Sequence, residues 1–201
     1  MPDYFNGPDK SESDLEKATE NNSLIHIDHF DELYMLMEVA DRLQKKPKVA
    51  IRVNMDTGIY PMWDRFGFNY ENGDAWDAIN RIMMSGKFEM VGLHTHIGTY
   101  MLSSNAFAIA ASKLADLALR IERKYETSLR YIDLGGGFAS RNTLKGAYLP
   151  ARIRFLHLTS MPKQLQGHFL ILRLTRRGCL PLYWRPAGHL STMPVTLSVL
   201  Y

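Results

Sequence analysis

The first 150 residues alternate between short apolar runs and longer segments in which apolar residues recur at helical spacing. The short runs are almost wholly apolar, which is typical of strands covered on both faces. Strictly alternating strands and helices predict a parallel sheet with right-handed crossovers. Strands are expected at 4–7, 24–27, 49–53, 88–93 and 129–134, and helices at 30–43, 74–84 and 105–123, with another opening at Ser11.

Local signals support several of these boundaries. Ser11 is a plausible N-cap, because an acid follows it three positions later at Asp14. Pro47 ends the second helix, and a long loop is expected from Asn54 to Gly73. The polar residues of interest follow the strands, at the edge where barrels and open α/β sheets both keep their sites. The pattern alone leaves a barrel and a doubly wound sheet as alternatives.

Charge divides the chain at Pro150. All 21 Asp and Glu residues precede it, whereas 7 of the 24 Lys and Arg residues follow it. The formal net charge of +3 therefore arises in the last part of the chain, and we expect no nucleic-acid partner for the whole protein. Cys179 is the single cysteine, which excludes a disulfide framework. With no signal peptide or membrane-spanning run, we expect a cytoplasmic protein without a membrane partner.

Two motifs carry the chemistry. His94-Thr95-His96-Ile97-Gly98-Thr99 follows one apolar run, and Asp133-Leu134-Gly135-Gly136-Gly137-Phe138 follows a later one. Glycines after a strand leave backbone N–H groups unobstructed, which suits a phosphate, and a histidine beside them offers a flat ring. Together they predict a cofactor pocket. Taken singly, a glycine triplet also suits a tight turn, and a histidine also suits a hydrogen-bonded core position.

These motifs, in this order, resemble the pyridoxal 5'-phosphate (PLP) decarboxylases of diaminopimelate, ornithine and arginine. The resemblance covers residues 4–150, includes Arg65-Phe66-Gly67, and is greatest to the diaminopimelate branch of lysine biosynthesis. It implies an α/β fold. The chain would form a partial (β/α)8 TIM barrel of the alanine racemase-like type and contain about strands 3 to 7 of that barrel. The domain expected over 1–150 is therefore a partial PLP-binding barrel.

The resemblance also implies the cofactor-binding residues, which are Arg52, His96, Thr99, Gly135, Gly136 and Gly137. His96 would stack on the pyridine ring, and Thr99 and the glycines would meet the phosphate. Arg52 would approach the phenolic oxygen of the ring, or equally form a salt bridge in the barrel mouth. We expect packing or hydrogen bonding for His94, and loop organisation for Asp28 and Asp133. No metal is expected, because we see no Cys or carboxylate cluster beside the histidines.

The implied parent reaction is decarboxylation of meso-diaminopimelate or a related basic amino acid. Alternatives are a racemase-like PLP barrel and a non-catalytic homologue that binds a partner decarboxylase. In the family, the Schiff-base lysine lies on the first strand, upstream of anything resembling this chain, and Lys10, Lys48 and Lys87 do not match it. We therefore expect no catalytic residue and no activity from this chain. The parent family forms homodimers, which we do not expect of this fragment.

Residues 151–201 form a separate, basic tail without the alternating pattern. Under one permitted coding, a one-base shift turns 185–194 into a segment containing Glu-x-Gly-Arg, which resembles the family's eighth-strand motif. The same shift makes 151–165 compatible with the family's segment after the seventh strand. We interpret the tail as a frameshift product that was not selected to pack on the barrel. The alternative is a basic arm for nucleic acid or anionic lipid.

Overall fold

The computed structural model describes residues 4–99, 101–137 and 182–183. Within them, seven strands form one sheet in the order β1-β2-β3-β5-β6-β7, with β4 beside β3. Every neighbouring pair runs parallel. The strands are β1 (Tyr4–Phe5), β2 (Leu24–Ile27), β3 (Lys48–Asn54), β4 (Phe68–Asn69), β5 (Glu89–Thr95), β6 (Tyr131–Asp133) and β7 (Leu182–Tyr183).

Four helices connect these strands: α1 (Glu12–Glu20), α2 (Phe30–Leu43), α3 (Asp74–Ser85) and α4 (Ser104–Tyr125). The expected cap of α1 is confirmed, since the Ser11 side chain accepts the Asp14 N–H while Asp14 accepts the Ser11 N–H. Helix α2 has the expected bounds, and its C-cap residue Gln44 adopts a left-handed conformation before Pro47.

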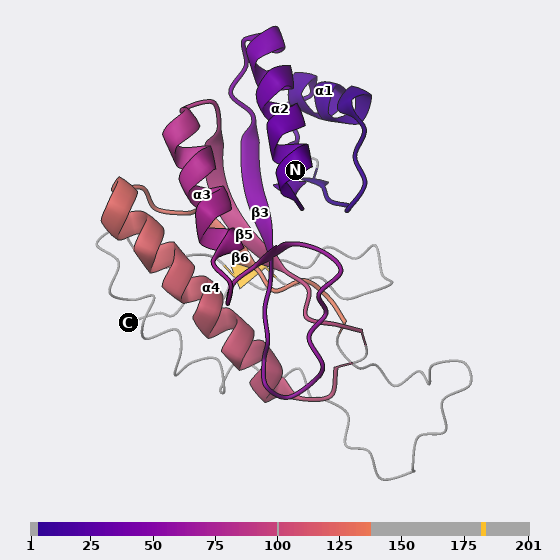
Figure 1. Ribbon diagram of the computed structural model, residues 1–201, viewed down its shortest axis with the longest axis vertical. Helices are drawn as coiled ribbons and strands as arrows, with labels where there is room; N and C mark the ends of the chain where they lie inside the picture. The colour runs from indigo at the N-terminus through magenta and orange to yellow at the C-terminus, as the bar shows by residue number, and fades with distance from the viewer. Residues whose placement is uncertain (1–3, 100, 138–181, 184–201) are drawn as a thin grey trace, which may run out of the picture.

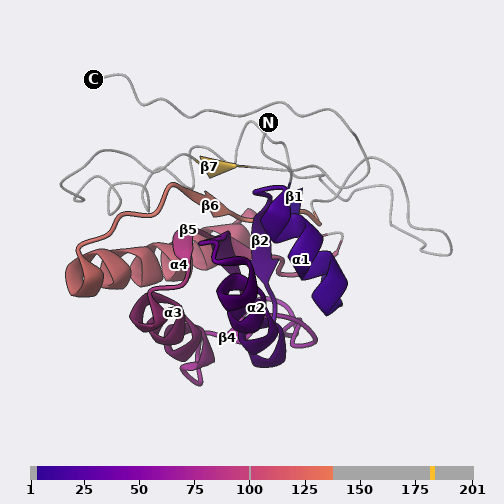
Figure 2. The same cartoon turned by 90° about the horizontal axis from the view of Figure 1, so that it is seen from above.

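The helices lie on one face of the sheet, which decides between the two expected architectures. Figure 2 shows α1 to α4 along one side of a curved row of strands, and Figure 1 shows α2, α3 and α4 packed over β3, β5 and β6. A doubly wound sheet places helices on both faces, whereas a barrel keeps them outside. The described part is therefore a curled, parallel α/β half-barrel, as the barrel prediction required.

The two faces of the sheet have different contents. Between the helices and the outer face lies the main core, where Leu33, Ile51, Leu93 and Leu114 are completely buried. On the inner face lies a smaller apolar cluster, which consists of Leu24, Ala50, Val91 and Tyr131, with Tyr4 packed against it. Burial on both faces explains why the strands are apolar at nearly every position.

Beyond this inner cluster, the side chains of the inner face become polar. The parallel register pairs Arg52 with His94, and His94 with Asp133. Because alternate residues of a strand share a face, His26 and Asp28 follow Leu24 on the same side of β2. Polar groups thus gather inside the half-barrel towards the carboxyl ends of the strands.

Gly92 on β5 makes room for a contact that crosses the sheet. The Tyr131 ring of β6 lies where a Cβ at position 92 would stand, and its hydroxyl is 2.7 Å from His26 Nε2 on β2. We expect Gly92→Ala to lower the free energy of unfolding by about 1–3 kcal/mol, through overpacking against this ring. Urea unfolding measures the loss, with Ala50→Gly as a comparison that relieves packing in the same layer. A Gly92→Ala variant as stable as the parent would contradict this role.

Two parts of the sheet were not anticipated. The loop expected over 54–73 contains β4, whose two residues pair with Val53 and Asn54 and are too short to show any periodicity. The backbone of β7 pairs with β6 and lies inside the segment interpreted as a frameshift product. The rest of that segment is outside the described residues, so its interpretation stays a prediction.

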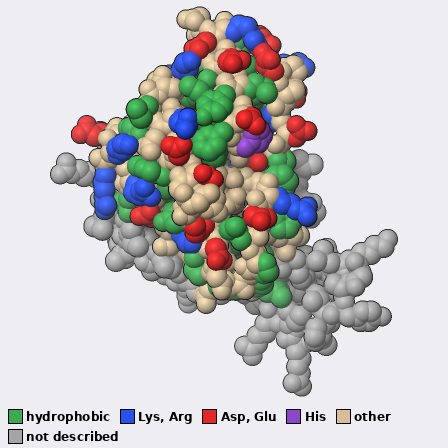
Figure 3. All heavy atoms as spheres, viewed as in Figure 1, with side chains coloured by type: hydrophobic (Ala, Val, Ile, Leu, Met, Phe, Trp, Pro, Cys, Tyr) green, Lys and Arg blue, Asp and Glu red, His purple; other side chains and the backbone are tan. Residues whose placement is uncertain are grey.

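The surface over the described helices carries mixed charges. Figure 3 shows Lys and Arg interspersed with Asp and Glu and with apolar side chains on the face that carries α2, α3 and α4. Ion pairs there include Arg81 with Asp77 and Lys87 with Asp41. In the described part of the chain, no helix combines the length and the apolar character needed to cross a membrane.

Candidate cofactor site

Two glycine turns, one after β5 and one after β6, are packed backbone against backbone. A Cβ on Gly135 would overlap the Thr95 carbonyl oxygen, and a Cβ on Gly137 would overlap the Gly98 carbonyl oxygen. The Met101 N–H donates to the Gly137 carbonyl at 2.7 Å, which ties the turns together. Gly98, Gly135 and Gly137 also have positive φ angles of 145°, 67° and 92°. Glycine is therefore required here for both space and backbone conformation.

His96 borders these turns. It follows β5, it is half-buried, and its Cε1 lies 3.4 Å from the position of a Cβ on Gly137. The Trp63 ring meets the imidazole edge-on, with centroids 6.4 Å apart. Burial lowers the pKa of His96, and the charge of Arg52 lowers it further. The imidazole is therefore neutral at pH 7, which suits stacking on a planar ring.

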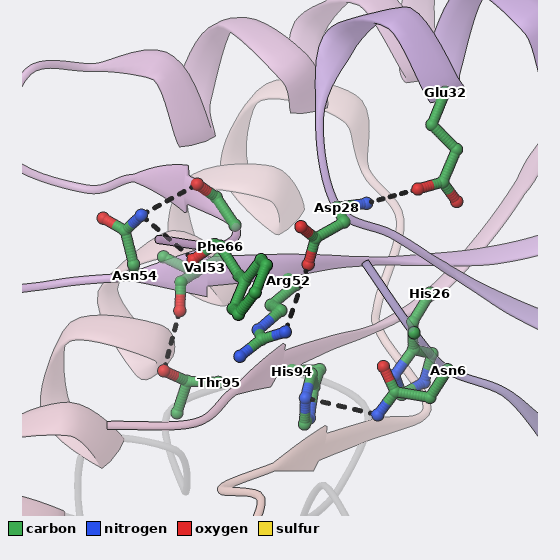
Figure 4. Close-up of polar contacts among 12 residues, drawn as sticks. Asn6, His26, Asp28, Glu32, Arg52, Val53, Asn54, Phe66, His94 and Thr95 are labelled. Atoms are coloured by element: carbon green, nitrogen blue, oxygen red, sulfur yellow. Dashed lines mark hydrogen bonds and ion pairs between the residues drawn. The ribbon is translucent and has the colours of Figure 1, made fainter. Parts of the chain in front are cut away.

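Arg52 is buried on the inner face of β3 beside the same site. Its Nη1 lies 3.3 Å from Asp28 Oδ1, and its guanidinium carbon lies 5.0 Å from the centre of the Phe66 ring (Figure 4). Burial lowers the pKa of Arg52, while the Asp28 carboxylate opposes this shift. Asn54 donates to the carbonyls of Phe66 and Gly67, at 3.1 and 2.8 Å, so the Arg-Phe-Gly motif is held over Arg52. The salt bridge expected as one alternative is present.

The structure thus brings together the residues predicted to hold the cofactor. His96 and Thr99 follow β5, Gly135 to Gly137 follow β6, and Arg52 lies on β3 between β2 and β5. Thr99 is exposed next to the Gly98 turn, while Gly136 is half-buried between its neighbours. A backbone cradle without side chains, bordered by a neutral imidazole and a guanidinium, fits a phosphorylated planar ring.

A buried polar cluster that the sequence did not predict lies beneath this site. His94 Nδ1 is 3.1 Å from Asp133 Oδ2, and the side-chain nitrogen of Asn6 is 3.4 Å from His94 Nε2 (Figure 4). The rings of His26 and His94 are 4.9 Å apart. Only the register of the parallel sheet brings these residues together, and the alternation on β2 was the one available signal for His26.

The cluster contains three side chains that could hold a metal ion. A carboxylate does accompany His94, because His26, His94 and Asp133 offer ligand atoms within 4.8 Å of one another. Their hydrogen bonds to Tyr131, Asn6 and the Gly135 N–H occupy atoms of all three side chains. The absence of a metal stays a prediction.

The pKa of Asp133 reflects its hydrogen bonds. Burial by itself would raise this pKa, but the hydrogen bond and charge of His94, together with the Gly135 N–H, hold it below its ordinary value. Its folded-state pKa lies below the unfolded one. The ionised carboxylate therefore adds stability that is complete above the unfolded pKa and is lost as the pH falls through the folded pKa.

A buried ion pair links the loop after β1 to the start of α2, beside the end of β2. Lys10 Nζ lies 2.7 Å from Glu32 Oε1, and the two side chains are 0% and 1% exposed. The ammonium group also donates to the carbonyls of Gly7 and His26, at 2.5 and 2.7 Å. Burial raises the pKa of Glu32, and the Lys10 charge opposes this rise. Sequence reasoning considered Lys10 only as a lysine that did not match a catalytic one.

Comparison with known proteins relates this geometry to a family. Residues 4–153 match the family model described as the pyridoxal-binding domain of pyridoxal-dependent decarboxylases. The diaminopimelate decarboxylases of Bacillus methanolicus and Archaeoglobus fulgidus are 29% and 30% identical over 74% and 73% of this chain, and over 36% of their own lengths. An L-glutamyl-[BtrI acyl-carrier protein] decarboxylase of Niallia circulans is 30% identical over 67% of this chain and 33% of its own.

Solved structures show the same fold. A diaminopimelate decarboxylase from M. jannaschii in complex with L-lysine superposes with a TM-score of 0.76 at 21% identity, over 91% of this chain and 42% of that one. The Helicobacter pylori enzyme, also complexed with L-lysine, gives a TM-score of 0.74 at 22% identity, over 91% of this chain and 44% of that one. This chain spans about a third of the length of the curated relatives it matches.

Proposed function

This chain belongs to the pyridoxal-dependent decarboxylase family, and we propose that its described residues form part of the PLP site of an amino-acid decarboxylase. The observation that carries the proposal is the pair of interlocked turns at Gly98 and Gly135–Gly137, beside a neutral His96. Backbone N–H groups in such a turn bind anions without any charged side chain. The two turns are therefore suited to the phosphate end of the cofactor.

The residues have separate tasks in this proposal. The Gly135 N–H donates to Asp133 at 2.8 Å, so we assign the phosphate instead to the N–H groups of Gly136 and Gly137 and to the Thr99 hydroxyl. His96 would lie against one face of the pyridine ring. Arg52, held by Asp28, would approach the phenolic oxygen. When bound, PLP supplies the electron sink that takes up the electron pair left by the departing carboxylate.

For the substrate of the whole protein we propose meso-diaminopimelate or a related basic amino acid. The diaminopimelate decarboxylases among its relatives support this choice. The relative named for a glutamyl group on a carrier protein shows that substrates differ within the family. A racemase-like activity and a non-catalytic partner of a decarboxylase are the alternatives. We place the protein in the cytoplasm and propose that the whole enzyme is a homodimer.

We also propose that this chain, assayed alone, does not decarboxylate an amino acid. Lys10 is the buried lysine of the described residues, and its ammonium group is held by Glu32 and two carbonyl oxygens. It is therefore not available to bond covalently to the cofactor. We expect no release of CO2 from meso-diaminopimelate, lysine, ornithine or arginine above the background without protein. Release that depends on the chain would contradict this proposal.

Binding of the cofactor tests the site itself. We expect PLP to bind the chain at least about tenfold more tightly than pyridoxal, which lacks the phosphate, because charged hydrogen bonds to the turns contribute about 1.5–3 kcal/mol each. Tryptophan fluorescence reports the binding, since Trp63 lies edge-on to His96. Inorganic phosphate should compete with PLP. Equal affinities for PLP and pyridoxal would contradict a phosphate cradle at these turns.

A further inference from the structure

Asp133 connects the buried polar cluster to the glycine turn through two different oxygens. It is the last residue of β6 and is 6% exposed. Its Oδ1 accepts the Gly135 N–H at 2.8 Å, and its Oδ2 lies 3.1 Å from His94 Nδ1. The Gly135 contact requires an acceptor at position 133, and a carboxylate also presents its second, negatively charged oxygen to His94.

The contact with His94 selects one form of the imidazole. Asp133 Oδ2 lies 3.1 Å from Nδ1 as an ion-pair contact that is not aligned as a hydrogen bond. Its negative charge favours the ring form with the proton on Nδ1, which leaves Nε2 as an acceptor. The Asn6 side-chain nitrogen faces Nε2 at 3.4 Å and can donate to it. A single tautomer therefore suits both neighbours, the Asp133 charge on β6 and the Asn6 donor directly after β1.

The contact with Gly135 directs the turn. Gly135 has a φ of 67° and no room for a Cβ against the Thr95 carbonyl, so its own conformation is already restricted by β5. The hydrogen bond directs the Gly135 N–H at the buried Asp133 carboxylate. The backbone direction at Gly135 is therefore fixed. This sets the orientation of the Gly136 and Gly137 N–H groups, which an anion-binding turn must direct at its ligand.

We propose that Asp133 is a positioning residue of the cofactor site, which sets both the path of the Gly135–Gly137 turn and the tautomer of His94. The proposal rests on the proposed function, because it concerns the turn assigned to the cofactor phosphate. Asp133 itself would not contact the cofactor. It acts through the backbone of Gly135 and through the ring of His94.

Two substitutions separate the two tasks. Asp133→Ala removes both acceptors. Asp133→Asn keeps an oxygen for the Gly135 N–H but places an NH2 group against His94 Nδ1, where two donors would meet. His94 avoids this conflict only if its proton moves to Nε2. The Asn6 amide must then rotate so that its oxygen accepts the Nε2–H. Ile79→Val, a change at a fully buried site on α3, is the control for general loss of stability.

The first measurement uses the full chain without any ligand. We expect hydrogen exchange of the Gly135 amide to be about ten- to a hundredfold faster in Asp133→Ala than in Ile79→Val, because a hydrogen bond to a charged acceptor is lost. In Asp133→Asn we expect a smaller change at Gly135. The 15N shifts of the His94 ring should instead change from the Nδ1–H to the Nε2–H pattern, which loss of stability alone would not produce. If Asp133→Ala does not fold, the His94 readout in Asp133→Asn still decides.

The second measurement is binding of PLP and of pyridoxal to the same variants. We expect Asp133→Ala to weaken PLP binding about tenfold or more and to leave pyridoxal binding little changed. The proposal is overturned if Gly135 exchange and the His94 tautomer are the same in the variants as in the parent. It is also overturned if PLP affinity is unchanged while the turn is loosened. If the parent chain shows no preference for PLP over pyridoxal but Gly135 protection depends on Asp133, the proposed function fails and the positioning of the turn is supported.

Discussion

Lys10→Met is expected to lower the free energy of unfolding by about 3–5 kcal/mol, because it leaves the Glu32 carboxylate buried without its partner. The loss includes the two bonds to the carbonyls of Gly7 and His26, which hold the exits of β1 and β2 together. Chemical denaturation followed by circular dichroism measures the change. Arg42→Met is the matched control, because the Arg42–Glu12 pair has side chains 47% and 51% exposed and should contribute less than about 1 kcal/mol.

The same variant should also show a defined dependence on pH. Without the Lys10 charge, burial raises the pKa of Glu32 further above its unfolded value. A raised folded-state pKa of a carboxyl group means that the folded protein holds its proton more tightly, so stability falls as the pH rises. The Lys10→Met defect should therefore be smaller at low pH than at pH 7. A cost equal to that of Arg42→Met at every pH would show that the buried pair does not hold this part of the barrel.

Gly137→Ala is expected to remove the preference of the chain for PLP over pyridoxal. The new Cβ would overlap the Gly98 carbonyl oxygen, and the residue would still need a φ of 92°. Backbone strain of this kind costs about 1–3 kcal/mol, and overpacking costs a similar amount. The turn should therefore separate from the β5 loop, with a loss of phosphate-dependent affinity on the order of 100-fold, since each 1.4 kcal/mol is about tenfold.

Gly86→Ala controls for the strain alone. Gly86 ends α3 with a φ of 67° and has nothing within 4 Å of an added Cβ. Gly86→Ala should lower the free energy of unfolding by a similar strain energy and leave the ratio of PLP affinity to pyridoxal affinity unchanged. The affinity ratios of Gly137→Ala and Gly86→Ala are compared under conditions in which equal fractions of the two variants are folded. If Gly137→Ala kept the parent ratio, the interlocked turns could not be the phosphate cradle.

Much of the chain's local structure was predictable because it depends on neighbouring residues. The bounds of α2 and the cap of α1 follow from side-chain spacing and from one serine with an acid three positions later. The two motifs after β5 and β6 were also visible, because glycine and histidine types at strand ends carry information without any tertiary contact. Strand β4 was missed, since two residues show no period and form a strand only against β3.

By itself, the sequence determined the order of strands and helices apart from β4 and β7, the family and the residues proposed for the cofactor. These depend on residue types and on short spacings along the chain. The tertiary structure decided that the helices lie on one face, that Lys10 pairs with Glu32, and that Asp133 joins His94 to Gly135. Such contacts depend on sheet curvature and register, as between His26 and Tyr131, which are 105 positions apart. No local pattern specifies that register, because it is set by packing of the whole core.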